Sequence, residues 1–145
     1  MHQNMKNFYD HQDIKVSITL RPEDIATPPA CSLIVNNTVL FDSSLTSIRL
    51  FETTIELLQP VCVQVILKDK DYNTMPTVAL FIDSLKIDNF DIVPVWTGFA
   101  QYSNDKNVTS PTNFLGYNGI WLLNTREPFY RWQHKITGQG WLLEP

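Results

Sequence analysis

The sequence contains few of the residues from which catalytic and metal sites are usually built. Its 145 residues include three histidines, His2, His11 and His134, and two cysteines, Cys31 and Cys62. No Gly-x-Ser-x-Gly elbow or glycine-rich phosphate loop occurs. A catalytic nucleophile would also need a positioned base, for which the sequence offers only the three histidines. We therefore expect no enzyme activity and no cofactor. The cysteines lack zinc spacing and disulfide density, so we expect buried free thiols, with a disulfide between them as the alternative.

Positive charge and long apolar runs are also scarce. Lysine and arginine number 11 against 15 acidic residues, which gives a net charge of −4 and no basic field for a phosphate backbone. No run of about 18 apolar residues occurs, and the opening "MHQNMKNFYDHQD" lacks the pattern of a secretory signal. These features disfavour nucleic-acid binding and membrane insertion, and we expect synthesis in the cytoplasm.

What the sequence does contain is the pattern of β-strands. "IKVSITLR", residues 14–21, alternates apolar and polar side chains without error, as a half-buried strand does. "SLIVNNTVLF" carries a two-residue turn at Asn36 and Asn37, which pairs Val35 with Thr38 and Leu33 with Leu40. Turns recur at intervals of about ten residues, so we predict an all-β fold, a two-layer antiparallel β-sandwich of jelly-roll type. One such domain would occupy residues 13–145, after an N-terminal arm of residues 1–12.

Three aspartates lie within the stretch "FIDSLKIDNFDI", residues 81–92. A turn at Asp88 and Asn89 would place Asp91 opposite Lys86 on the wet face and Leu85 opposite Ile92. Strict alternation would aim Asp83 at the apolar face, so this residue needs a hydrogen-bond partner or a bulge. We interpret all three aspartates as structural, not as a metal or acid/base site.

The C-terminal third has a different texture. Residues 97–118 are rich in Asn, Ser, Thr, Gly and Pro, which predicts a long loop region. Strands are expected again at "GIWLLN" and at "FYRWQHKI", where Tyr130, Trp132 and His134 would share one face. A last short strand is expected in "TGQGWLLEP".

One loop resembles part of a calcium site. In "DKDYNT", Asp69, Asp71 and Asn73 have the spacing of the first three ligands of a calcium loop. The later positions do not fit, because Thr74 stands in place of the glycine and Leu80 in place of the bidentate glutamate. We interpret the segment as a polar loop, with these three residues kept as metal candidates.

Aromatic residues are concentrated in the C-terminal half. Ten of the seventeen lie between Trp96 and Trp141. Large rings with a polar handle serve both sugar platforms and protein interfaces. The expected core members are Trp96, Trp121, Trp132 and Trp141, and the candidates for an interface or glycan site are Phe99, Tyr102, Phe114 and Tyr117, with Phe8 and Tyr9 in the arm.

The stretch "LFIDSLKIDNFDI" and the ending from Glu127 to Pro145, which contains "EPFYRW" and "TGQGWLLEP", together cover about a quarter of the chain. In these stretches the sequence resembles small β-sandwich proteins of tailed bacteriophages, particularly cyanophages. The resemblance implies a jelly roll like that of carbohydrate-binding modules and an accessory role in the capsid, tail or baseplate. It supplies no catalytic residues.

We therefore predict a non-enzymatic virion protein, made in the host cytoplasm, that contacts other virion proteins and forms a homo-oligomer. Its N-terminal arm is expected to contact another chain. The alternative is a carbohydrate-binding module that recognises host surface glycans. Exposure of the rings at positions 99, 102, 114 and 117 separates the two, because a sugar platform needs exposed rings.

Overall fold

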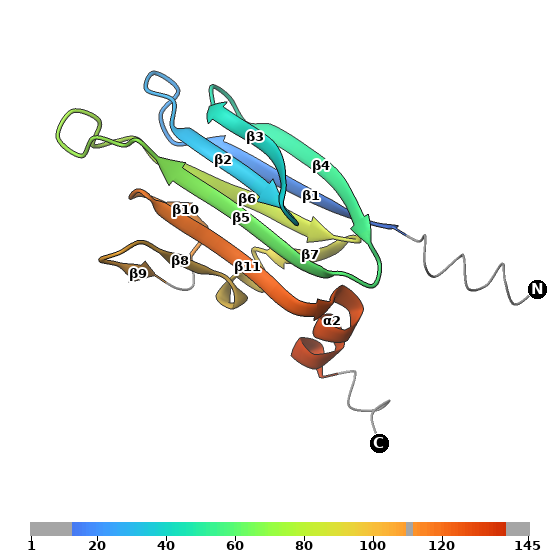
Figure 1. The fold of residues 1–145 in the computed structure, drawn as a ribbon. Coiled ribbons are helices and arrows are strands. Elements are labelled where there is room, and N and C mark those ends of the chain that lie inside the picture. Colours follow the sequence, from blue (N-terminus) through green and yellow to red (C-terminus); the bar gives the residue numbers. More distant parts are fainter. Residues whose placement is uncertain (1–12, 110–111, 139–145) are drawn as a thin grey trace, which may run out of the picture.

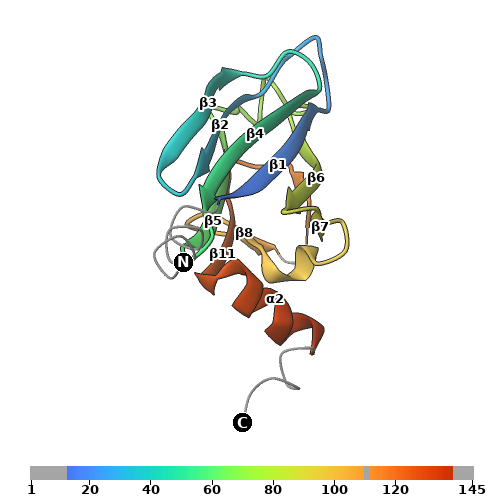
Figure 2. The same cartoon turned by 90° about the vertical axis from the view of Figure 1, so that its right-hand side faces the viewer.

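The computed structural model describes residues 13–109 and 112–138, which form two antiparallel sheets packed face to face (Figures 1 and 2). One sheet has the order β10-β6-β1-β4, with β7 also paired to β6, and the other has the order β3-β2-β5-β11-β8-β9. The predicted all-β, two-layer antiparallel sandwich is confirmed. The first sheet consists of β1 (Asp13–Pro22), β4 (Arg49–Glu56), β6 (Leu80–Ile87), β7 (Phe90–Val93) and β10 (Phe114–Leu115). The second consists of β2 (Ala30–Val35), β3 (Thr38–Ser44), β5 (Pro60–Lys68), β8 (Gln101–Ser103), β9 (Val108–Thr109) and β11 (Gly119–Pro128).

The core lies between the sheets and is built from strands whose side chains alternate between the core face and the outer face. Every second residue of β1 and of β5 is buried, as the period of two requires when one face meets the other sheet. Burying one such aliphatic side chain contributes about 1.5–3 kcal/mol. The buried hydrophobic residues of β1, β5 and β6 are Ile14, Val16, Ile18, Leu20, Val61, Val63, Val65, Leu67, Leu80, Ile82, Leu85 and Ile87.

Both predicted tight hairpins are present. Asn36 and Asn37 join β2 to β3 with φ angles of 46° and 69°, and Asp88 and Asn89 join β6 to β7 with φ angles of 49° and 67°. Asn and Asp tolerate this left-handed backbone better than other residues with a side chain. The turn chemistry therefore identified both hairpins correctly.

The pairs next to each turn are confirmed, with Val35 opposite Thr38 and Lys86 opposite Asp91. Farther from the turns the register differs from the prediction by one residue, because Leu33 pairs with Phe41 and Leu85 with Val93. A β-bulge inserts one extra residue on one strand and shifts every later pair. Simple counting outward from the turn could not reveal it.

Asp83 has both of the features expected for it. The pairing of β1 with β6 shifts register between Thr19 and Leu20, so that Asp83 is the extra residue on β6. Its Oδ2 accepts a hydrogen bond from Nε of Arg21 at 2.9 Å. The prediction that this residue needs a bulge or a partner is confirmed.

The strand predicted for "FYRWQHKI" is wrong, because this segment is the helix α2 (Phe129–Thr137). Phe129 and Trp132 are buried and Ile136 is half-buried, which is the i, i+3, i+7 spacing of one helix face. The helix follows Pro128 and ends at Gly138, whose φ of 79° is typical of a helix C-terminus. Tyr130, Trp132 and His134 therefore do not share one face of a strand.

Residues 97–118 contain more structure than predicted. They include the short helix η1 (Thr97–Phe99) and the strands β8, β9 and β10. Each strand has only two or three residues, which is too short to give a recognisable alternation.

Of the expected core tryptophans, Trp121 and Trp132 are buried and Trp96 is half-buried against the core. Trp141 and the predicted last strand lie outside the described residues, as do the arm, Phe8 and Tyr9. No helix in the described part of the chain has both the length and the apolarity to cross a membrane.

Candidate functional site

The four predicted aromatic candidates of the folded domain fall into three places. Tyr102 is buried and its ring stacks on Tyr117 with centroids 4.3 Å apart. Phe114 is 42% exposed and packs on Phe81 at the edge of the first sheet. Phe99 is 49% exposed and meets two tryptophans beside α2. Tyr117 also lines a hollow in the surface, and the buried Tyr102 ring stacks against the Tyr117 ring.

That hollow, here called the tyrosine hollow, has a volume of about 550 Å³. It lies between the β5–β6 loop, the β8–β9 turn and the segment that joins β10 to β11, which Figure 1 shows at one end of the sandwich. Its size is within the range typical of small-ligand sites. Its lining residues are Tyr72, Asn104, Asp105, Lys106, Asn107, Tyr117 and Asn118.

Tyr72 is held in place by the segment opposite. Its hydroxyl accepts a hydrogen bond from the backbone N–H of Asn118 at 2.8 Å, and its side chain is 51% exposed. The amide of Asn118 bonds both backbone groups of Lys70 at 2.9 Å, and Nζ of Lys70 donates to the carbonyl of Gly116 at 2.7 Å. The ring is therefore exposed to solvent and also fixed, which lowers the entropy lost when a ligand binds.

Tyr117 is fixed by a reciprocal contact with Tyr102. The hydroxyl of Tyr117 donates to the Tyr102 carbonyl, and the hydroxyl of Tyr102 accepts from the Tyr117 N–H, both at 3.1 Å. Gly119 makes this packing possible, since a Cβ there would lie 2.8 Å from the carbonyl oxygen of Ser103 and 3.2 Å from both rings. Burial raises the pKa of the Tyr102 hydroxyl above its usual value.

The β8–β9 turn supplies the polar wall. Oδ1 of Asn104 accepts from the backbone N–H groups of Lys106 and Asn107, and its Nδ2 donates to the carbonyl of Asn118 at 2.7 Å. Within the described ranges, the side chains of Asp105, Lys106 and Asn107 make no hydrogen bond. Their donors and acceptors are free to meet the hydroxyl groups of a ligand.

The calcium candidates lie in the loop that carries Tyr72. Oδ1 of Asp71 accepts from the backbone N–H of Asn73 at 2.9 Å and of Thr74 at 3.4 Å, and these bonds lower the pKa of the Asp71 carboxyl. Asp69 has a left-handed backbone, with φ of 61°. No group of three or more His, Cys, Asp or Glu side chains that could hold a metal ion occurs in residues 13–109 and 112–138.

We expect calcium to leave the melting temperature unchanged, because Asp71 already serves as the cap of its own turn. A ligand that binds only the folded state would raise the melting temperature. The measurement is a thermal melt with millimolar calcium and with chelator. A calcium-dependent rise that Asp71→Ala abolishes would show that the three residues are ligands.

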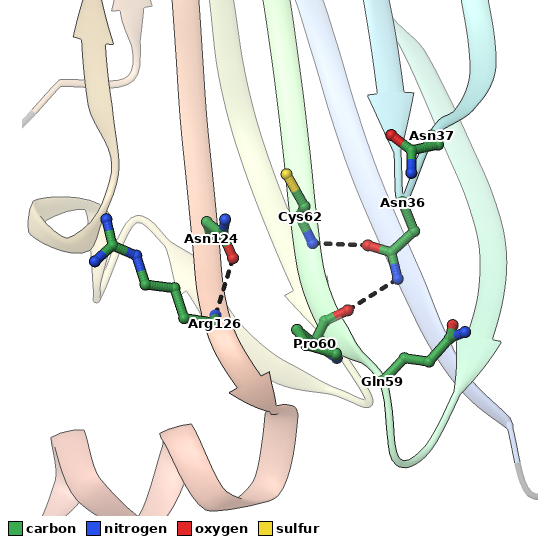
Figure 3. A pocket seen from close by; sticks show the side chains of 7 residues that line it. All are labelled: Asn36, Asn37, Gln59, Pro60, Cys62, Asn124 and Arg126. Atoms are coloured by element: carbon green, nitrogen blue, oxygen red, sulfur yellow. Dashed lines mark hydrogen bonds between the residues drawn. The ribbon is translucent and has the colours of Figure 1, made fainter.

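A second hollow, here called the amide hollow, lies at the opposite end of the β5–β11 pair (Figure 3). Its volume is about 610 Å³, and Figure 3 shows Arg126 at one end and Gln59 at the other. None of the residues that line it was predicted as a site from the sequence, which indicated only a turn at Asn36 and Asn37 and a free thiol at Cys62. The lining residues are Asn36, Asn37, Gln59, Pro60, Cys62, Asn124 and Arg126.

Both cysteines are free, as predicted. Cys31 is buried, and burial raises the pKa of its thiol to about 11. Cys62 is only half-buried, which corrects the expectation that both are buried. Its side chain points outward because it follows Val61 and precedes Val63, which both face the core.

His134 lies on α2 and lines neither hollow. Tyr72 was missed as a site residue because the surrounding letters suggested a calcium loop. The available signal was a single large ring inside an otherwise polar loop between two strands.

Two solved structures have a similar fold. One is vCBM60 in complex with galactobiose, with a TM-score of 0.53 and 12% sequence identity, covering 76% of this chain and 98% of that chain. The other is a selenomethionine form of vCBM60, described with a circular permutation that links two families of calcium-dependent carbohydrate binding modules. Its TM-score is 0.51 and its identity 10%, covering 76% of this chain and 89% of that chain. No family model and no curated protein matches the sequence.

The similarity establishes a β-sandwich fold like that of a carbohydrate-binding module, as the resemblance noted in the sequence implied. Neither structure bears on a bacteriophage origin. The virion role, the homo-oligomer and the location in a virion stay predictions.

Proposed function

We propose that this chain is a carbohydrate-binding module and that the tyrosine hollow is its ligand site. The observation that carries the proposal is the pair of fixed tyrosine rings, at positions 72 and 117, beside unpaired polar side chains. The fold, shared with vCBM60, supports it. The proposed role is binding without catalysis.

The chemistry of the hollow suits a sugar. A pyranose ring has apolar C–H faces, which pack on an aromatic face, and hydroxyl groups around its rim, which need donors and acceptors. Tyr72 provides the exposed face, and Asp105, Lys106 and Asn107 provide side-chain acceptors and donors. Asp105 and Lys106 carry opposite charges, so the site favours no strongly charged ligand.

This proposal adopts the alternative interpretation of the sequence in preference to the virion role. The exposure of the four candidate rings is mixed, since Tyr102 is buried and Phe99 and Phe114 are separate, so they do not form one sugar platform. The platform instead combines Tyr117 with Tyr72. A host surface glycan as the natural ligand is part of the proposal.

Tyr72→Ala is expected to weaken glycan binding by about tenfold or more, because removing a packed ring costs at least about 1.4 kcal/mol of binding free energy. The measurement is calorimetric titration of the full chain with galactobiose and with the hits of a glycan array. Each titration is run with calcium and with chelator, since calcium-dependent families are named with one structural neighbour.

Tyr130→Ala is the matched control, because Tyr130 is an exposed tyrosine of α2 that does not line the hollow. The Tyr130→Ala variant should bind the glycan with the affinity of the unchanged protein. The proposal is wrong if no glycan binds, or if both variants lose binding equally.

A further inference from the structure

The amide hollow has a floor fixed by one asparagine. Nδ2 of Asn36 donates to the carbonyl of Pro60 at 2.9 Å, and its Oδ1 accepts from the N–H of Cys62 at 2.7 Å (Figure 3). This side chain ties the β2–β3 turn to the start of β5. The side-chain amides of Asn37 and Gln59 make no hydrogen bond within the described part of the chain, so they are available at the wall of the hollow.

The other end of the amide hollow is shaped by an irregularity in β11. The register with β5 shifts between Asn124 and Pro128. The hydroxyl of the buried Thr125 accepts from the N–H of Val61 at 2.9 Å and donates to the carbonyl of Glu127 at 2.7 Å. Internal bonds therefore hold the bulge in one shape, and such bulges often redirect a side chain at a functional site.

The side chain that the bulge redirects is Arg126. Its φ is 62°, an uncommon backbone for arginine, and its N–H donates to Oδ1 of Asn124 at 2.9 Å. Its guanidinium has no ion pair and no ring contact within residues 13–109 and 112–138. The other three described arginines each have one: Arg21 with Asp83 and Phe81, Arg49 with Phe41 and Phe51, and Arg131 with Glu127.

The amide hollow carries positive charge only. Arg126 is the one charged residue among its seven lining residues, and no carboxylate lines it. The neighbouring Glu127 is engaged by Arg131 at 3.3 Å and by Lys135 at 3.1 Å. In a chain of net charge −4, this hollow thus presents an unpaired cation beside neutral amides.

We propose that the amide hollow is a second binding site, for an acidic oligosaccharide. The guanidinium of Arg126 would take the anionic group, a carboxylate or a sulfate, since its planar fork donates two parallel hydrogen bonds. The amides of Asn37, Gln59 and Asn124 both donate and accept, as sugar hydroxyls require. The lining runs from Arg126 on β11 past Cys62 on β5 to Asn37 beside β2, and these are neighbouring strands of one sheet, so the hollow fits a chain of sugars better than a lone anion.

The experiment titrates the full chain with three probes at low ionic strength: a galacturonic acid trisaccharide, a sulfated galactose trisaccharide and the uncharged galactose trisaccharide. At least one acidic probe should bind, and more tightly than the uncharged one after Tyr72→Ala has removed the proposed neutral site. Raising sodium chloride from about 20 mM to about 300 mM should weaken this binding severalfold, since salt screens exposed charges. The acidic probe that binds identifies the anion.

The decisive variant is Arg126→Asn, which removes the charge but keeps a residue that tolerates the positive φ. It should lower the affinity for the acidic probe about tenfold or more and leave the melting temperature unchanged or slightly higher. Arg131→Gln is the matched control, because Arg131 is an exposed arginine of α2 that lines neither hollow. That variant should bind as the unchanged protein does.

The second site and the tyrosine hollow can fail separately. If no acidic probe binds, or if Arg126→Asn and Arg131→Gln lose affinity equally, the second site is wrong. If Tyr72→Ala lost binding of the acidic probe and Arg126→Asn kept it, the acidic probe would bind in the tyrosine hollow. That result would also overturn the second site. Loss of galactobiose binding in Tyr72→Ala bears on the first proposal only.

Discussion

Tyr102→Ala is expected to lower the free energy of unfolding by about 3–5 kcal/mol, the range measured for removing large buried aromatic side chains. Only 1% of Tyr102 is exposed, and its ring stacks on Tyr117. The substitution would leave a cavity beneath the tyrosine hollow and remove the acceptor of the Tyr117 N–H. Chemical denaturation followed by tryptophan fluorescence measures the loss.

Tyr102→Phe is the control for this effect. It keeps the ring and removes only the hydroxyl, so we expect a loss of about 1–2 kcal/mol from the unpaired N–H. If Tyr102→Ala were as stable as the unchanged protein and lost only glycan binding, Tyr102 would be a ligand contact. The burial described above would then be wrong.

Tyr102 illustrates why the site could be predicted only in part. The sequence placed it in a polar loop region, which favoured an exposed ring. In the structure it lies on β8, and its Cα pairs with that of Trp121 on β11. A three-residue strand has no alternation of its own, so only the distant partner determines that its central side chain points into the core.

The parts of the fold that were predicted correctly depend on local chemistry. β1 is identified by its alternation alone, and the hairpins at Asn36 and Asp88 by residues that tolerate a left-handed backbone. The segment of α2 was misassigned because "FYRWQHKI" is compatible with both periods. Burial of Phe129 and Trp132, three residues apart, settles it as a helix.

Neither hollow follows from local sequence. The tyrosine hollow forms where three loops meet, and its fixed ring at position 72 depends on Asn118, 46 residues away in the chain. The unpaired guanidinium of Arg126 depends on a bulge that is held by Thr125 against Val61. Such non-local contacts have no periodic signature, because they arise from the packing of turns that are separately specified.

Asn36→Ala is expected to destabilise the protein by about 2–5 kcal/mol. The side chain makes two hydrogen bonds to the backbone of β5, worth about 0.5–1.5 kcal/mol each, and the Cys62 N–H would lose its acceptor. Alanine at a φ of 46° adds about 1–2 kcal/mol of backbone strain. Thermal and urea unfolding measure the sum.

Two matched variants separate the effect of the lost hydrogen bonds from that of the backbone strain. Asn37→Ala meets a similar φ of 69° but removes no side-chain hydrogen bond of the described residues, so it should cost only the strain, about 1–2 kcal/mol. Asn36→Gly tolerates the positive φ and removes the bonds, so it should cost about 1–3 kcal/mol. If Asn36→Ala and Asn37→Ala are equally destabilising, the bonds of Asn36 contribute nothing and the floor of the amide hollow is not fixed by this side chain. If instead the predicted difference is found, Asn36 is the residue that couples the β2–β3 turn to β5, and the amides of the hollow are positioned before any ligand arrives.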